Sequence, residues 1–228
     1  MADVTPLYDA AASDDEDMRA ADGRVPGRRG RATRQRLLDC TAGMLDTTSY
    51  RDVKVIDIAR EAGTSPATFY QYFSDVEAAI LVLAEEMARR GAHLADVVSE
   101  GAWDEEGAYG TALALVDGFL SFWDENRSVL RVVDLATDEG DGRFRKIRVS
   151  FLNDITRALA EVTRVAQAAS RLPRGLDPMA VAGVLVSMLA HTAAHQYGFE
   201  FWGIRTKDLR TSMARQVSWG VTGFLPPD

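Results

Sequence analysis

Apolar side chains recur every three or four residues along almost the whole chain after residue 31, and strict alternation of apolar and polar residues is nearly absent. This spacing matches the helical repeat, so the sequence predicts an all-α fold. Glycine, proline and helix-capping residues interrupt the pattern and divide it into about nine helices. We expect these around residues 37–45, over 55–62, 66–73, 75–99, 109–125 and 129–136, from 144 to the break at 173–175, from 178, and over 207–220.

The segment from residue 55 to residue 73 has the pattern of a helix-turn-helix. Gly63 can take the left-handed conformation that follows many helix ends, and Ser65 followed by Pro66 is a strong start signal for a new helix. Phe69 and Phe73 then share the helix face that anchors it, and the sides left over carry Ala67, Thr68, Tyr70 and Gln71. Such a short polar face suits a DNA major groove, where glutamine can pair with adenine and threonine or alanine can meet a thymine methyl group.

These residues resemble the TetR family of bacterial transcriptional regulators. The similarity lies in the runs 57–65 and 68–73, followed by 77–80. It implies a three-helix DNA-binding head over residues 31–76 and a helical effector-binding and dimerisation domain over residues 77–228.

The resemblance also assigns DNA contacts to individual positions, which are a lysine before the motif and the accessible positions of its second helix: Lys54, Ser65, Pro66, Ala67, Thr68, Tyr70, Gln71 and Tyr72. Two positions depart from the family pattern. Ser49 stands where glycine is usual, and Val76 replaces a lysine that contacts the DNA backbone. The alternative interpretation of the whole motif is a buried helical hairpin with no role in DNA binding.

Charge is distributed in blocks at the start of the chain. The formal net charge is -8, yet residues 1–18 carry six acids and no base, whereas residues 19–36 carry seven arginines and one acid. We expect residues 1–30 to form a flexible arm, acidic and then basic. Arginines at the end of this arm, namely Arg28, Arg29 and Arg31, are candidates for DNA phosphate or minor-groove contacts. The alternative is a solvated tail.

Composition excludes several classes of protein. Cys40 is the single cysteine, which rules out an internal disulfide and any multi-cysteine metal site. The most apolar run, residues 178–190, is shorter than the roughly 20 residues that a spanning helix needs, and no secretory signal is visible. We therefore expect a cytoplasmic protein without membrane contact.

The sequence contains few features of an enzyme. It lacks a glycine-rich phosphate loop and an activated serine motif, so we expect no catalytic residue and no cofactor. His191 and His195 have the spacing of a metal-binding pair, with Glu200 or His93 as a conceivable third ligand. However, Thr192 stands where a zinc peptidase has its glutamate. A pair of core or pocket histidines is the favoured interpretation, so no metal site is predicted.

The family resemblance implies an effector pocket among the central helices. Large aromatic side chains beside a few polar groups are typical of a site for a lipophilic ligand, although the same stripes also occur in a plain core. The candidate pocket residues are Phe119, Phe122, Trp123, Phe151, Met188 and His191.

The last two helices are predicted to form a homodimer interface. Residues 178–190 are apolar nearly all round the helix, which exceeds what one side of a monomer core needs. The candidate interface residues are Val184, Leu209, Met213 and Val217. The sequence thus predicts a homodimeric repressor that binds a near-palindromic operator and is released by a small, mainly apolar effector. The alternatives are a DNA-binding regulator without a small-molecule ligand and a helical metal-binding protein that uses His191 and His195.

Overall fold

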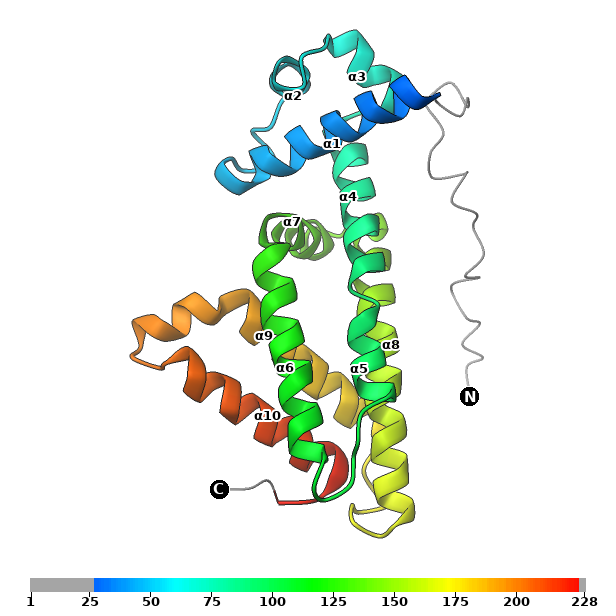
Figure 1. Ribbon diagram of the computed structural model, residues 1–228, viewed down its shortest axis with the longest axis vertical. Helices are drawn as coiled ribbons and strands as arrows, with labels where there is room; N and C mark the ends of the chain where they lie inside the picture. The colour runs from blue at the N-terminus through cyan, green and yellow to red at the C-terminus, as the bar shows by residue number, and fades with distance from the viewer. Residues whose placement is uncertain (1–26, 226–228) are drawn as a thin grey trace. The chain divides into compact units, whose positions relative to one another are not determined.

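The computed structural model describes residues 27–225, and this range contains ten α-helices and no strand (Figure 1). The predicted all-α fold is therefore confirmed. The helices are α1 (Arg28–Thr47), α2 (Val55–Glu61), α3 (Pro66–Tyr72), α4 (Val76–Arg90), α5 (His93–Ser99), α6 (Ala108–Glu125), α7 (Arg127–Asp138), α8 (Gly142–Ala168), α9 (Pro178–Phe201) and α10 (Thr206–Thr222). The chain divides into two compact units, Met1–Leu83 and Ala84–Asp228. The division falls within α4, later than the predicted boundary after residue 76.

The first unit is a small helical head in which α1, α2 and α3 pack on one another. Its core contains Leu37, Ile58 and Phe69, all fully buried. Gly63 has a φ of +64°, so it makes the left-handed turn between α2 and α3 that the sequence predicted. The Ser65 hydroxyl accepts a hydrogen bond from the Thr68 amide at 3.2 Å and caps α3.

The basic arm ends earlier than predicted. Helix α1 begins at Arg28, and the Arg31 amide donates to the Gly27 carbonyl at 2.9 Å, so Gly30 lies inside the first helical turn. The prediction of a flexible arm up to residue 30 is therefore wrong for its last residues, because one glycine lowers helix propensity without stopping a helix. The acidic block and the arginines at positions 19 and 24 lie outside the described residues.

The predicted single helix over residues 75–99 is two helices, α4 and α5. The chain between them is tight at Gly91, where a Cβ atom would lie 2.3 Å from the Phe151 ring and 2.8 Å from the Phe122 ring. The backbone then turns with short-range hydrogen bonds, and the His93 imidazole lies 2.7 Å from the Arg90 carbonyl. Two aromatic rings from distant parts of the chain leave no room for a side chain at position 91, so only glycine fits there, and glycine lowers helix propensity where α4 ends.

The second unit is a bundle in which α6 packs against α5, α9 and α10, while α8 packs against α5, α7, α9 and α10. The Asp177 carboxylate caps α9 by accepting from the amides of Met179 and Ala180, as the sequence predicted. By length and composition alone, α9 is long and apolar enough to cross a membrane. However, 39% of its most apolar stretch is buried within this unit. The rest of α9 forms a separate exposed surface.

Candidate functional site

Helix α3 presents a polar face on an aromatic anchor. Phe69 is fully buried, and its ring lies 5.4 Å from the Phe73 ring and 5.8 Å from the Tyr70 ring. Tyr70 and Gln71 are exposed, and Tyr70 keeps 53% of its surface accessible. The head therefore holds these two side chains outward on a rigid helix.

The other residues predicted on α3 take two kinds of position. Pro66 and Ala67 are exposed in the first turn together with the capping Ser65. Thr68 is half-buried, and its hydroxyl lies 3.0 Å from the Ser65 hydroxyl, which ties the threonine to the cap. Tyr72 is also half-buried, with its ring 6.4 Å from that of Phe73.

Exposed cations flank this helix on the same head. Lys54 precedes α2, and Arg28, Arg29 and Arg31 are exposed in the first turn of α1. The sequence did not single out Arg34, whose guanidinium lies 5.4 Å from the centre of the Phe73 ring. This cation–π contact joins α1 to the end of α3 and so links the basic end of α1 to the candidate DNA-binding helix.

A cluster of aromatic rings lies in the second unit. The Phe119 ring stacks on Trp123 at 5.3 Å, and the Phe122 ring stacks on Phe151 at 5.0 Å. The rings of Trp123 and Phe151, whose centres lie 5.9 Å apart, complete the cluster. Such contacts stabilise the rings in fixed orientations.

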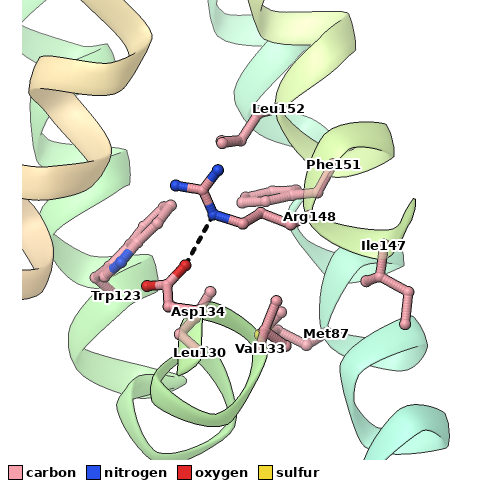
Figure 2. A pocket seen from close by; sticks show the side chains of 9 residues that line it. All are labelled: Met87, Trp123, Leu130, Val133, Asp134, Ile147, Arg148, Phe151 and Leu152. Carbon is pink, nitrogen blue, oxygen red and sulfur yellow. Dashed lines mark hydrogen bonds and ion pairs between the residues drawn. The ribbon is translucent and has the colours of Figure 1, made fainter. Parts of the chain in front are cut away.

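A small pocket opens beside this cluster among α4, α6, α7 and α8 (Figure 2). Most of its walls are apolar, and the lining residues are Met87, Trp123, Leu130, Val133, Asp134, Ile147, Arg148, Phe151 and Leu152. Its cavity volume is only about 10 Å³, which is room for about one water molecule. Ligand sites for small organic molecules usually measure roughly 300–1,000 Å³, so side chains must move before such a molecule fits.

Two polar features mark the pocket. The Arg148 Nε donates to the Asp134 carboxylate at 2.8 Å, and both side chains are partly exposed. The indole nitrogen of Trp123 is buried and has no hydrogen-bond partner among the described residues. An unpaired buried N–H group costs folding free energy, so it is uncommon in native proteins.

The structure separates the six predicted effector residues. Trp123 and Phe151 line the pocket, whereas Phe119 and Phe122 are buried in the ring cluster beside it. Met188 is half-buried on α9 and His191 is exposed there, and neither lines the pocket because α9 contributes no wall to it. Sequence reasoning missed Asp134 and Arg148, since these lie on different helices and no local spacing connects them.

Two regions of the chain match descriptions of known protein families. Residues 37–78 match the bacterial regulatory proteins of the tetR family, and residues 94–228 match the tetracyclin repressor-like C-terminal domain, which alone is more than half of the chain. The chain belongs to the TetR family. It is therefore a transcriptional regulator of a DNA-binding family, and the resemblance seen in the sequence is confirmed.

Individual proteins resemble this TetR-family chain in sequence or in fold. It is 26% identical over 199 residues to the HTH-type transcriptional regulator YdgC of Bacillus subtilis, covering 87% of this chain and 95% of YdgC. A Rhodococcus sp. RHA1 protein of unknown function shares the fold with a TM-score of 0.65 and 23% identity, covering 83% of this chain and 95% of that one. FadR of Bacillus subtilis, solved in complex with stearoyl-CoA, shares the fold with a TM-score of 0.60 and 16% identity. The match covers 83% of this chain and 98% of FadR.

The residues predicted at a dimer interface differ in how far the single chain exposes them. Val184 is 70% exposed on α9, and Leu209 is half-buried on α10. Met213 and Val217 are instead buried in the core of their own unit, where α10 packs against α6, so neither side chain is exposed to a partner in the single chain. An apolar stripe on α10 fits a monomer core as well as it fits a partner chain.

One side of α9, which we call the outward face, remains exposed along its length. Its residues follow helical spacing and are Ala180, Val184, Ser187, His191, His195 and Gly198. The two imidazole rings stack with their centres 4.3 Å apart, and the His195 Nδ1 lies 2.9 Å from the His191 carbonyl. Within residues 27–225, no third histidine, cysteine or carboxylate joins this pair to make a metal site. The suggested third ligands Glu200 and His93 therefore do not complete one.

Two contacts hold α9 and α10 to α6 next to this face. The Tyr197 hydroxyl donates to Asp124 at 2.5 Å, and this hydrogen bond raises the pKa of Tyr197. The Arg210 guanidinium on α10 donates to the Asp117 carboxylate on α6 and forms an ion pair with it. The contacts fix the orientation of both helices within the second unit.

The single cysteine, Cys40, is a half-buried free thiol on α1. Burial raises the pKa of the Cys40 thiol, and the negative charges of Glu61 and Asp39 raise it further. A raised pKa disfavours the thiolate, which is the reactive form of cysteine.

Proposed function

We propose that the protein is a homodimeric repressor whose helix α3 reads a near-palindromic operator and whose second unit binds a small, mainly apolar molecule that weakens operator binding. The observation that carries the DNA-binding part is the exposed pair Tyr70 and Gln71, held outward by the fully buried Phe69. A helix of this kind fits a major groove and reads base edges there.

The outward face of α9 supports dimerisation. It combines the exposed apolar Val184 with the small residues Ala180 and Gly198, which allow a second helix to approach closely. A two-fold pairing of α9 with its copy would bring two heads to half-sites about one helical turn apart. Trp219 on α10 is 52% exposed and extends the apolar surface available to a partner.

The apolar pocket supports an effector. A fold neighbour, FadR of Bacillus subtilis, was solved with stearoyl-CoA, and the pocket here is lined mainly by aliphatic and aromatic side chains. A ligand that fits only after the walls move favours an altered conformation, which is what a switch requires. Met87 brings α4, the helix that follows α3 along the chain, into the pocket lining. Displacement of Met87 would therefore act on α4 directly.

The small cavity volume favours one alternative, a regulator that binds no small molecule. A thermal-shift screen of hydrophobic compounds distinguishes the two, because a ligand present at a hundred times its dissociation constant stabilises the folded protein by about 2.7 kcal/mol. If no compound raises the melting temperature, the proposal of a small-molecule effector is wrong, and only the proposal of DNA binding remains.

Gln71→Ala tests the DNA-binding part. Loss of a bidentate adenine contact is expected to cost about 1–3 kcal/mol of operator affinity and to relax the base preference at one position per half-site. Fluorescence anisotropy with an operator obtained by binding selection, and with its single-base variants, measures both effects. Gln35→Ala is the control, since Gln35 is exposed on α1 and bonds to Asp39. Equal weakening on every sequence would show that Gln71 reads no base.

Replacing Arg28 and Arg29 together by glutamine tests the cations of α1. If both meet phosphates, the slope of log affinity against log salt should flatten by about 0.9 per contact, while the preference among operator variants stays the same. The matched control replaces Arg157 and Arg164, which are exposed on α8. An unchanged slope in the α1 variant would assign these arginines to solvent.

A further inference from the structure

We propose that the pocket shown in Figure 2 selects an amphipathic anion, whose negatively charged head pairs with Arg148 and accepts a hydrogen bond from the Trp123 indole. The inference rests on the proposed function, because the anion would be the effector. It adds the chemical class of that effector and the two side chains that recognise it.

Trp123 supplies a donor that lacks an acceptor. The side chain is only 5% exposed, and its Nε1 has no hydrogen-bond partner among the described residues. The ring contacts with Phe119 and Phe151 hold the indole in place, so the N–H cannot simply turn toward water. A ligand oxygen placed there would satisfy the donor, and that gain would be available only to ligands with an acceptor.

Arg148 supplies the positive charge. It bonds to Asp134 through Nε alone, and its terminal nitrogens make no hydrogen bond within residues 27–225. Figure 2 shows these nitrogens directed away from Asp134, on the side of Trp123 and Leu152. A guanidinium with free terminal N–H groups matches the paired oxygens of a carboxylate or phosphate.

The existing ion pair presents a small barrier to this exchange. Arg148 and Asp134 keep 43% and 40% of their side-chain surface exposed, and ion pairs exposed to that extent contribute little to stability. Asp134 can stay hydrated after it loses its partner. In this arrangement Asp134 competes with the ligand head for Arg148.

The remaining lining is apolar and would receive the hydrocarbon part of the ligand. Met87 comes from α4, Leu130 and Val133 from α7, and Ile147 and Leu152 from α8, so three helices supply this apolar lining. Because the cavity is small, the chain of the ligand must displace some of these side chains. Flexible methionine and leucine side chains make such displacement feasible.

Calorimetric titration of the full-length protein with decanoate, 1-decanol and decylamine tests the inference. Decanoate is expected to bind at least about tenfold more tightly than decanol, since a charge-assisted hydrogen bond is worth that much or more. Decylamine should bind most weakly. Arg148→Gln should remove the preference for decanoate over decanol, and Trp123→Phe should weaken decanoate more than decanol.

Asp134→Asn gives an effect of the opposite sign. It removes the competitor and its negative charge, so decanoate should bind severalfold more tightly than to the unchanged protein. Asp154→Asn makes the same change of charge at an exposed residue on α8 that does not line the pocket, so it should leave both affinities unaltered.

The possible failures are distinguishable. Equal binding of decanol and decanoate, with release of the operator by both, would overturn the charge selection and leave the proposed function intact. A preference for decanoate that survives in Arg148→Gln would place the head elsewhere and overturn the inference. If none of the three compounds binds, the inference fails, while the Gln71→Ala experiment still decides the DNA-binding part independently. If decanoate binds as expected but does not weaken operator binding, the recognition is right and its regulatory role is wrong.

Discussion

Val184→Asp is expected to convert the protein to monomers and to abolish operator binding. Val184 is 70% exposed on the outward face of α9 in the single chain, so the substitution costs the isolated unit little. In the proposed dimer the same side chain is buried against the partner, and an unpaired buried charge costs about 3–5 kcal/mol. That cost corresponds to at least about a hundredfold rise in the dissociation constant of the dimer. Light scattering over a range of protein concentrations measures it.

Val149→Asp is the matched control for this experiment. Val149 is also an exposed valine, with 58% of its surface accessible, but it lies on α8 rather than on α9. This variant should remain dimeric and bind the operator normally. If both variants behave alike, or if Val184→Asp stays dimeric, the interface does not include the outward face.

Phe69→Ala is expected to unfold the head and to remove DNA binding while the second unit stays folded. Phe69 is fully buried and contacts the rings of Tyr70 and Phe73. Removing a buried phenylalanine side chain costs about 3–5 kcal/mol. A unit as small as residues 27–83 has little stability to lose. Hydrogen exchange followed by mass spectrometry would report lost protection in α1–α3 and retained protection in α6–α10.

Ile56→Ala provides the comparison on the same head. Ile56 is 59% exposed on α2, and exposed substitutions usually change stability by no more than about 0.5 kcal/mol. Protection of α1–α3 should therefore be unchanged in this variant. Retained protection in Phe69→Ala as well would mean that α3 is anchored by other contacts.

The helix-turn-helix was predictable because its signals are local. Gly63 turns the chain, Ser65 caps α3 and Phe69 anchors it, and all three act within one or two helical turns of their own position. The start of α9 at Asp177 and Pro178 follows the same logic. The signals for these features lie close together in the chain, so the order of residues is enough to reveal them.

The candidate pocket was only half predictable. Trp123 and Phe151 stand out as large rings in apolar stripes, and both line the pocket. Asp134 and Arg148 do not stand out, because charged residues at such positions are ordinary on helix surfaces. Only the packing of α7 against α8 brings the two side chains within 2.8 Å.

The helical class, the turn and cap around α3, and membership in a family of DNA-binding regulators follow from the order of residues, because each depends on periodicity or on residues close together in the chain. The close approach of the Phe122 and Phe151 rings to Gly91, where α4 gives way to α5, is visible only in the folded chain, because these residues are far apart in the sequence. The tertiary structure also decided that Met213 and Val217 face their own core while Val184 faces outward. Apolar residues at helical spacing indicate that one side of a helix is buried, but they do not identify the neighbour that buries it. That neighbour depends on how the helices pack.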